Sequence, residues 1–252
     1  MATALITGAS SGIGEEFARQ LAERGHDLVL VARNETKLRQ VAAALDWVNV
    51  EVLPADLSKA ADTDRVAARL SQSERPISLL VNNAGFGLGQ VFVEGDTQRE
   101  LDALNVMVRA VMVLSQAAAR AMKARHHGAI VNISSMASWT AGGTYAAHKT
   151  WVNVFSEALA SELKGSGVTV TSVRPGTTAT EFFDKIGFDF ASLPTIARIS
   201  PQQVVAEAMR GVSAGKVEVV PSFTYKVVDA LTHISPRPLI RLITGRSSWR
   251  IR

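Results

Sequence analysis

The sequence contains no cysteine, which excludes disulfide bonds, thiolate catalysis and cysteine-ligated zinc. No apolar run approaches the roughly 18 residues that a membrane-spanning helix needs. The first residues, MATALITGAS, lack the basic start and the apolar stretch of a signal peptide. No Pro/Gly/Ser-rich linker, low-complexity segment or internal repeat divides the chain. We therefore expect a single domain over residues 1–252, located in the cytoplasm.

The overall composition is typical of a globular protein, because 47% of the 252 residues are hydrophobic and 20% are charged. The net charge of +4 comes from the C-terminal end, because residues 201–252 hold 8 Lys and Arg against 3 Asp and Glu. A basic excess suggests nucleic acid or an anionic surface as partner, but no nucleic-acid-binding motif is present. Residues 230–252 are expected to be a basic C-terminal extension. We favour a short helix followed by a solvated tail over a segment that binds anionic lipid weakly.

Short apolar or β-branched runs alternate with stretches of helical periodicity. The runs cover residues 4–6, 28–31, 48–53, 77–81, 129–133, 168–173 and 217–220. The helical stretches cover residues 15–23, 35–45, 63–70, 99–122 and 150–163. Near-continuous apolar strands are typical of a sheet that is covered on both faces. The alternation predicts an α/β domain with a doubly wound parallel sheet of about seven strands and helices on both faces.

The region after residue 177 breaks this pattern, because apolar side chains crowd residues 182–196 without a clear period. Ligands of open α/β sheets bind beyond the carboxyl ends of the strands, where such connections gather. Residues 177–200 are therefore expected to form a lid-like connection or a small helical insertion. This segment either only packs on the sheet or also lines a substrate site.

A glycine-rich turn, Thr7-Gly-Ala-Ser-Ser-Gly-Ile-Gly14, joins the first predicted strand to the first helix. Gly8 permits a tight turn, Gly12 lets the backbone approach a pyrophosphate, and Gly14 lets helix and strand pack closely. The helix N-terminus offers free N–H groups and a partial positive charge to phosphate. The turn therefore predicts a dinucleotide site on a Rossmann-like fold, rather than a plain tight turn.

The end of the second strand indicates which dinucleotide binds. A site for NAD usually places an acidic residue there to accept hydrogen bonds from the ribose 2′-hydroxyl. Ala32 offers no carboxylate, whereas Arg33 offers a cationic fork suited to a 2′-phosphate, and Ser10 adds a hydroxyl donor. We therefore predict NADP(H) rather than NAD(H). The alternative for Arg33 is a solvated surface arginine.

Polar side chains also follow the third and fourth strands. Asp56 could accept a hydrogen bond from the exocyclic amine of adenine, or it could cap the next helix. Asn82 and Asn83 can each join two backbone strands, and Ala84 and Gly85 leave room for a ribose. These residues extend the predicted cofactor site along the same edge of the sheet.

A second group of residues points to acid–base chemistry. Tyr145 and Lys149 are four residues apart on one face of a helix, where an ammonium lowers the pKa of a phenol. A tyrosine whose pKa is lowered in this way can exchange a proton with a carbonyl or alcohol oxygen. Ser134 and Ser135 end the fifth strand and could bond that oxygen. Asn105 lies within a predicted helix, where asparagine is unfavourable, so it is either functional or a satisfied core amide.

Together these residues resemble the short-chain dehydrogenase/reductase family, of the one-domain type, over about residues 3–220. The glycine-rich turn is the first element of the resemblance. The remaining motifs follow in the family's order and are Asp56, Asn82-Asn-Ala-Gly85, Asn105, Ile133-Ser-Ser135, Tyr145-Ala-Ala-His-Lys149 and Pro175-Gly-Thr-Thr-Ala-Thr180. Each motif alone is weak, but the set is very specific.

The resemblance implies four catalytic residues. Tyr145 would be the general acid–base, and Lys149 would bind the nicotinamide ribose and lower the pKa of Tyr145. Ser135 would steady the substrate oxygen. Asn105 would hold a water in a proton relay with Lys149.

The resemblance also implies contacts along the whole cofactor, from adenine at one end to the nicotinamide carboxamide at the other. The expected cofactor-binding residues are Gly8, Ser10, Ser11, Gly12, Ile13, Gly14, Arg33, Asp56, Leu57, Asn82, Ala84, Gly85, Tyr145, Lys149, Pro175, Gly176, Thr178 and Thr180. Among these, Asp56 and Leu57 would meet adenine, and Arg33 stands at the position that marks NADP preference.

One departure from the family lies between the serine and the tyrosine. Only nine residues separate Ser135 from Tyr145, fewer than the family usually has. Because this loop helps to form the substrate pocket, its shortening leaves the pocket shape open. It also leaves Ser134 and Ser138 as alternatives to Ser135.

These features predict an NADP(H)-dependent oxidoreductase that interconverts a carbonyl and a secondary alcohol. The apolar segment 177–200 favours a hydrophobic substrate, such as a lipid, a steroid-like molecule or an aromatic ketone. The alternative is a non-enzymatic NADP(H)-binding regulatory protein on the same fold. The resemblance also implies a homo-oligomer, dimer or tetramer. No metal is expected, because His126 and His127 lack further ligands at suitable spacing.

Overall fold

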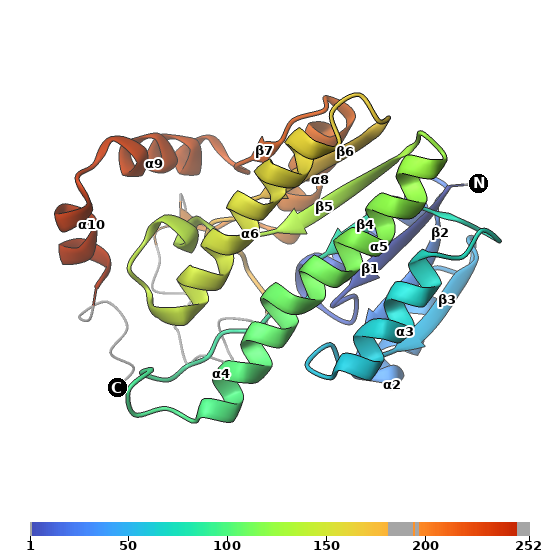
Figure 1. The fold of residues 1–252 in the computed structure, drawn as a ribbon, viewed down its shortest axis with the longest axis horizontal. Helices are drawn as coiled ribbons and strands as arrows, with labels where there is room; N and C mark the ends of the chain where they lie inside the picture. Colours follow the sequence, from blue (N-terminus) through green and yellow to red (C-terminus); the bar gives the residue numbers. More distant parts are fainter. Residues whose placement is uncertain (1, 181–193, 195–196, 246–252) are drawn as a thin grey trace.

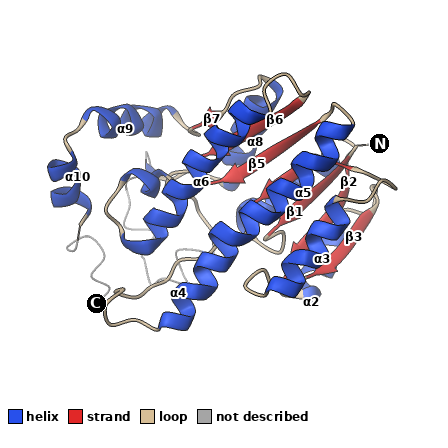
Figure 2. Cartoon of the chain, viewed as in Figure 1, coloured by secondary structure: helices blue, strands red, loops and turns tan. Residues whose placement is uncertain are grey.

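The computed structural model describes residues 2–180, 194 and 197–245. Within these residues the sheet has seven parallel strands in the order β3-β2-β1-β4-β5-β6-β7. The strands are β1 (Thr3–Thr7), β2 (Asp27–Ala32), β3 (Val50–Pro54), β4 (Ile77–Asn82), β5 (Gly128–Ile133), β6 (Val168–Val173) and β7 (Glu218–Val219). Helices cover both faces of this sheet (Figures 1 and 2), which confirms the predicted Rossmann-like α/β architecture.

The helices fall into two layers and a C-terminal pair. They are α1 (Gly12–Glu23), α2 (Glu35–Ala43), α3 (Ala60–Leu70), α4 (Thr97–Leu104), α5 (Ala110–Ala124), α6 (Gly143–Glu162), α8 (Pro201–Ser213), α9 (Phe223–Ile234) and α10 (Arg237–Thr244). Two short turns complete the set, a π-helical turn η1 (Asn105–Arg109) and a 3-10 turn η2 (Met136–Trp139).

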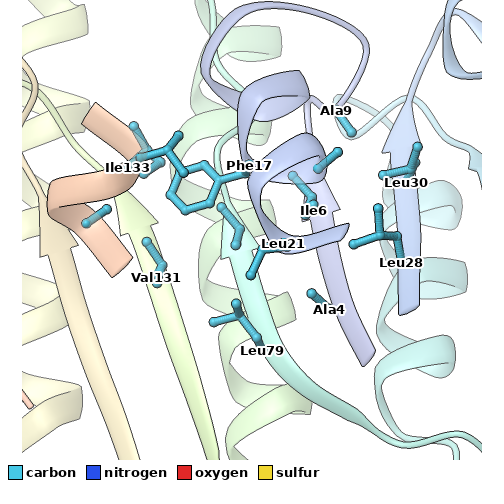
Figure 3. Close-up of a cluster of buried hydrophobic side chains, with 14 of the residues drawn as sticks. Ala4, Ile6, Ala9, Phe17, Leu21, Leu28, Leu30, Leu79, Val131 and Ile133 are labelled. Atoms are coloured by element: carbon cyan, nitrogen blue, oxygen red, sulfur yellow. The ribbon is translucent and has the colours of Figure 1, made fainter. Parts of the chain in front are cut away.

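One face of the sheet is packed by α1, α2 and α8. On α1, Phe17 and Leu21 lie one turn apart and are fully buried. Figure 3 shows them over the strand side chains Ile6, Leu79 and Val131, which come from three neighbouring strands. Burial of each such side chain contributes about 1.5–3 kcal/mol. This packing holds the first turn of α1 against the ends of the strands.

The opposite face is packed by α3, α5 and α6 (Figure 1). The helical stretch Thr97–Ala124 is long and apolar enough to cross a membrane by length and composition. However, Ala103, Met107, Ala110 and Leu114 recur every three or four residues and are buried against the sheet. The stretch is therefore a core helix of this layer.

Two helices differ from the sequence prediction. The helix expected over residues 99–122 is interrupted by η1, a π-helical turn that begins at Asn105. Such turns are rare and often mark functional sites. The helix expected over residues 150–163 begins earlier, at Gly143, so that Tyr145 and Lys149 lie in its first two turns.

The two segments expected beyond the core lie only partly within the described residues. Of the expected lid over residues 177–200, residues 181–193 and 195–196 lie outside them. Residues 246–252 of the expected C-terminal extension also lie outside them. The described part of that extension forms the end of α9 and all of α10.

Candidate active site

The glycine-rich turn between β1 and α1 is coiled so tightly that side chains are excluded. Gly8 and Gly12 have φ values of 66° and 60°, in the left-handed region that glycine tolerates best. A Cβ atom on Gly14 would lie 2.2 Å from the carbonyl oxygen of Gly8, and one on Gly12 would lie 3.0 Å from Cγ2 of Thr180. The free backbone of this turn leads directly into the N-terminus of α1. Such a cradle fits the pyrophosphate of a dinucleotide.

Asn83 holds the glycine-rich turn against the end of β4, which lies beside β1 in the sheet. The Asn83 Nδ2 atom lies 3.0 Å from the carbonyl oxygen of Thr7 and 3.2 Å from that of Gly8. The Asn83 backbone N–H donates to Oγ1 of Thr7 at 3.0 Å, and this hydroxyl in turn bonds the carbonyl of Val81. This bridging by asparagine was expected from the sequence, and Asn83 provides it between the ends of β1 and β4.

The side chain of the neighbouring Asn82 is bonded within the fold. Its Nδ2 atom donates to Oγ of Ser115 at 3.0 Å and to Oδ1 of Asn132 at 2.9 Å. The side chain is 4% exposed and lies between β4, β5 and α5. The Asn82 amide hydrogens therefore hold the interior of the fold, and the ribose contacts implied for Asn82, Ala84 and Gly85 stay predictions.

The expected adenine end lies after β2 and β3. Arg33 is exposed at the carboxyl end of β2, whereas Asp56 and Leu57 follow β3 and are partly or fully buried. Oδ1 of Asp56 accepts from the backbone N–H and the hydroxyl of Ser58, at 3.1 and 2.8 Å. The N-cap of α3 is Lys59, so Asp56 does not cap this helix, and its hydrogen bonds to Ser58 stabilise the loop before it. Its contact with adenine stays a prediction.

Tyr145, Ser135 and Lys149 come together at the ends of β5 and α6. The side chain of Ser135 hydrogen-bonds Tyr145. The Lys149 ammonium is 5.8 Å from the centroid of the Tyr145 ring and donates to the carbonyl oxygen of Ile133 at 2.8 Å. A Cβ atom on Gly85 would lie 3.5 Å from Nζ of Lys149, so the backbone after β4 reaches this group. The catalytic candidates therefore lie next to the edge of the sheet at which the cofactor is expected to bind.

The three serines that the shortened loop left as candidates differ in their hydrogen bonds. Oγ of Ser134 donates to the backbone carbonyl of Lys149 at 2.8 Å, and Oγ of Ser138 accepts from Nδ2 of Asn153 at 2.8 Å. Both serines are buried in these structural bonds. Ser135 is the member of the three whose hydroxyl bonds Tyr145.

Asn105 is the first residue of η1, and this turn packs against α6. Its side chain is partly buried. Met107 of the same turn lies beside Gly85, where Lys149 also approaches. The structure therefore brings the Asn105 turn to the lysine end of the site. The water relay implied by the resemblance stays a prediction.

Burial controls the protonation of the two central groups. It raises the pKa of Tyr145 to about 12, and the hydrogen bond from Ser135 opposes this increase. Burial lowers the pKa of Lys149 to about 8. The lowering of the Tyr145 pKa by the Lys149 ammonium, which the resemblance implied, stays a prediction. At neutral pH Tyr145 holds its proton and is able to donate it.

The lowered pKa of Lys149 predicts how stability depends on pH. The unfolded chain binds a proton here up to the ordinary value of 10.5, but the folded chain only up to about 8. Because the unfolded state binds more protons in this window, the free energy of unfolding should rise with pH, by up to about 2 kcal/mol between pH 8 and about pH 10. Urea denaturation should show this rise in the wild type and not in Lys149→Met. Parallel pH profiles in the two proteins would contradict it.

The loop after β6 is held by a tyrosine that sequence reasoning missed. A Cβ atom on Gly176 would lie 2.1 Å from Cζ of Tyr225, so the ring of this α9 residue covers the glycine. Its hydroxyl accepts from the backbone N–H of Thr177 at 3.0 Å and donates to the carbonyl oxygen of Ala197 at 2.8 Å. Gly176 is therefore needed for packing as well as for any contact with nicotinamide. Thr178 is buried in the same loop.

A buried ion pair fixes α9 to this loop and was also missed. Arg174, 2% exposed, precedes Pro175 and donates to both carboxylate oxygens of Asp229, at 2.7 and 2.8 Å. Glu218 lies 3.4 Å from the same guanidinium. Bidentate pairs of this kind are strong and directional. No local sequence signal could reveal this one, because its partners lie 44 and 55 residues further along the chain.

Comparison with known proteins agrees with this arrangement. A family model described as short chain dehydrogenase matches residues 2–189. An uncharacterized oxidoreductase of Staphylococcus aureus (strain MRSA252) is 32% identical over 176 residues, which cover 69% of this chain and 76% of that protein.

Two solved structures are similar over nearly the whole chain. A short-chain dehydrogenase from Sphingobium yanoikuyae in complex with NADPH has a TM-score of 0.83 and 34% identity, covering 98% of both chains. The bulky-bulky ketone specific alcohol dehydrogenase from Comamonas testosteroni has a TM-score of 0.80 and 29% identity, covering 98% of this chain and 96% of that one. With the motifs brought to one edge of the sheet, these matches confirm the resemblance seen in the sequence. The protein is an oxidoreductase that belongs to the short-chain dehydrogenase/reductase family.

Proposed function

We propose that the protein is an NADP(H)-dependent oxidoreductase that interconverts a carbonyl and a secondary alcohol on a hydrophobic small molecule. The observation that carries this proposal is the buried Tyr145, which is bonded to Ser135 and lies one helical turn from Lys149. A regulatory protein that only binds the dinucleotide would have no use for such an acid–base group.

Different residues of the chain would bind the cofactor and act on the substrate oxygen. The backbone of the Gly8–Gly14 turn and the N-terminus of α1 would hold the pyrophosphate, and the loop after β6 would hold the nicotinamide end. When bound, the dinucleotide supplies or accepts the hydride. Tyr145 donates its phenolic proton to the carbonyl oxygen as that oxygen becomes an alkoxide, and takes the proton back in the reverse direction. The Ser135 hydroxyl donates a second hydrogen bond to the same oxygen, which stabilises its developing charge.

Lys149 supports this chemistry from the cofactor side. Its ammonium lies close to the Tyr145 ring and to the backbone at Gly85, where a ribose would fit. Donation from Lys149 to the ribose hydroxyls would orient the cofactor beside Tyr145. Its positive charge would also favour transient loss of the phenolic proton.

The preference for NADP(H) is proposed from Arg33, which is exposed at the carboxyl end of β2 with no acidic residue beside it on that strand. Arg33→Asp should weaken NADPH binding about 10- to 100-fold, because charge-assisted hydrogen bonds contribute about 1.5–3 kcal/mol. It should also improve NADH binding. Titration of both cofactors by tryptophan fluorescence gives the ratio, with the exposed Arg39→Gln on α2 as control. An unchanged ratio in Arg33→Asp would contradict the proposed role of Arg33.

A hydrophobic, bulky carbonyl compound is the proposed substrate class. Support comes from the apolar sequence of residues 182–196 and from the name of the Comamonas testosteroni relative, a bulky-bulky ketone specific enzyme. The test is NADPH consumption, followed by absorbance, with a panel of aromatic, steroid-like and long-chain ketones and small aliphatic controls. Bulky ketones should be reduced fastest. Tight NADPH binding without turnover of any ketone would favour the regulatory alternative.

We also propose that the protein is a homo-oligomer through the α5 and α6 face. Met112 on α5 and Val154 on α6 are 46% and 58% exposed, although both are large apolar side chains. Light scattering on the full chain would measure the assembly. Val154→Glu should lower its mass if this face is the contact.

A further inference from the structure

The C-terminal helices α9 and α10 project together at one end of the molecule, beyond the β7 edge of the sheet (Figure 1). Both helices contact the body of the protein, yet neither belongs to the two layers that cover the sheet. Both helices leave large apolar side chains exposed, unlike an ordinary surface helix, whose apolar side faces the core.

On α9 the polar side chains face inward. The Tyr225 hydroxyl bonds the loop after β6, Asp229 pairs with the buried Arg174, and His233 packs on Trp139 with ring centroids 4.2 Å apart. No residue of this helix is buried. Its outward side exposes Phe223, Val227, Leu231 and Ile234, which are 81%, 44%, 54% and 79% exposed.

On α10 one polar and one apolar side chain face inward, and further apolar side chains are exposed. The Thr244 hydroxyl accepts from the backbone N–H of Ala141 at 2.9 Å, and Ile240 is the one buried residue of the helix. Leu239, Leu242 and Ile243 are 45%, 76% and 64% exposed. These three side chains lie within one face, since positions three and four apart are neighbours on a helix.

Each of the two helices therefore presents large apolar side chains to the outside. Water does not favour such a surface, and exposed patches of this kind mark contact with another protein or with a membrane. The charges on the same helices distinguish these partners. Lys226, Arg237 and Arg241 are exposed, although Lys226 also pairs with Glu207 at 3.5 Å and Arg237 also donates to the carbonyl oxygen of Trp139 at 3.1 Å. Asp229 is the single acidic residue of the two helices and is already paired with Arg174.

We propose that the outer face of α9 and α10 docks on an anionic lipid bilayer. Apolar side chains would enter the boundary between headgroups and acyl chains, and the arginines would meet the headgroup phosphates. The sequence after residue 237 strengthens the charge match, because it adds arginines and no acidic residue. A second copy of the chain fits less well, because it would bring more basic residues and no unpaired acidic residue of these helices to the contact. The inference does not depend on the proposed chemistry.

The experiment is co-sedimentation of the full chain with lipid vesicles. Vesicles of phosphatidylcholine alone are compared with vesicles in which part of the phosphatidylcholine is replaced by phosphatidylglycerol. The wild type should bind the anionic vesicles, and added salt should weaken the binding. The double variant Leu242→Gln with Ile243→Gln should lose it. The matched control, Leu242→Met with Ile243→Val, keeps the surface apolar and should bind like the wild type.

The basic residues are tested separately. Arg237→Gln with Arg241→Gln should weaken binding about 30-fold, because each basic residue near an anionic surface contributes about fivefold. Arg39→Gln with Arg99→Gln removes the same charge from other exposed sites and should have a much smaller effect. Circular dichroism checks that each variant is folded.

Three results would overturn the proposal. The first is wild-type protein that stays in the supernatant with anionic vesicles. The second is binding that survives in the Leu242→Gln and Ile243→Gln variant. The third is a change of oligomeric state of that variant, measured by light scattering, which would identify a second copy of the chain as the occupant of the face.

Discussion

Tyr145→Phe should reduce ketone turnover by about 10²- to 10⁴-fold, the range that a positioned general acid contributes. The substitution removes one hydroxyl and keeps the ring, so that the packing around Lys149 is preserved. NADPH affinity should change little, because Tyr145 is only one of the many residues that are expected to contact the dinucleotide. Single-turnover absorbance with the fastest ketone of the panel measures the rate, and fluorescence titration measures NADPH binding.

The chain offers a matched control for this variant, since it contains only two tyrosines. Tyr225→Phe removes the other phenolic hydroxyl and the hydrogen bonds that hold the loop after β6. Each such bond contributes about 1 kcal/mol to stability, so Tyr225→Phe should lower the free energy of unfolding and retain most of the turnover. If Tyr145→Phe turned over ketone like the wild type, Tyr145 would not be the acid.

Asp229→Ala should destabilise the fold by about 3–5 kcal/mol, the cost of leaving one partner of a buried ion pair without the other. Arg174 is 2% exposed and gives two hydrogen bonds to Asp229. The neighbouring Glu218 cannot fully replace this carboxylate, because it lies 3.4 Å away and burial raises its pKa. Urea denaturation followed by circular dichroism measures the loss.

Two further variants separate the ion pair from simple truncation. The double variant Arg174→Met with Asp229→Leu replaces both charges by apolar groups and should recover much of the lost stability. Glu35→Ala, which breaks the exposed pair with Arg39 on α2, should cost less than about 1 kcal/mol. An equal loss in Asp229→Ala and Glu35→Ala would mean that the buried pair does not secure α9.

The sequence was sufficient for the architecture because each strand is a short apolar run bounded by turns. It was also sufficient for the glycine-rich turn and for the Tyr145–Lys149 pair, whose spacing is local. It did not reveal η1, since the helical pattern of apolar residues continues through Asn105 with no residue that marks a change of winding. It gave no reason to separate the amide of Asn82, which is used inside the fold, from that of Asn83.

The features that connect distant segments were out of reach of the sequence. Arg174 appears as one basic residue between a strand and a proline, and its role depends on Asp229 in α9. Tyr225 and Gly176 are likewise adjacent only after folding. The burial that raises the pKa of Tyr145 was out of reach for the same reason: the spacing to Lys149 was visible in the sequence, but the extent of burial was not.

The most direct test of the proposed oxidoreductase is transfer of a labelled hydride. NADPH carrying deuterium at the transferable position of its nicotinamide ring is incubated with the wild type and a bulky ketone, and the product is analysed by mass spectrometry. The account predicts an alcohol with one deuterium on the former carbonyl carbon, formed by the wild type and almost absent with Tyr145→Phe. An unlabelled product, or no alcohol from any ketone that the protein binds together with NADPH, would contradict it.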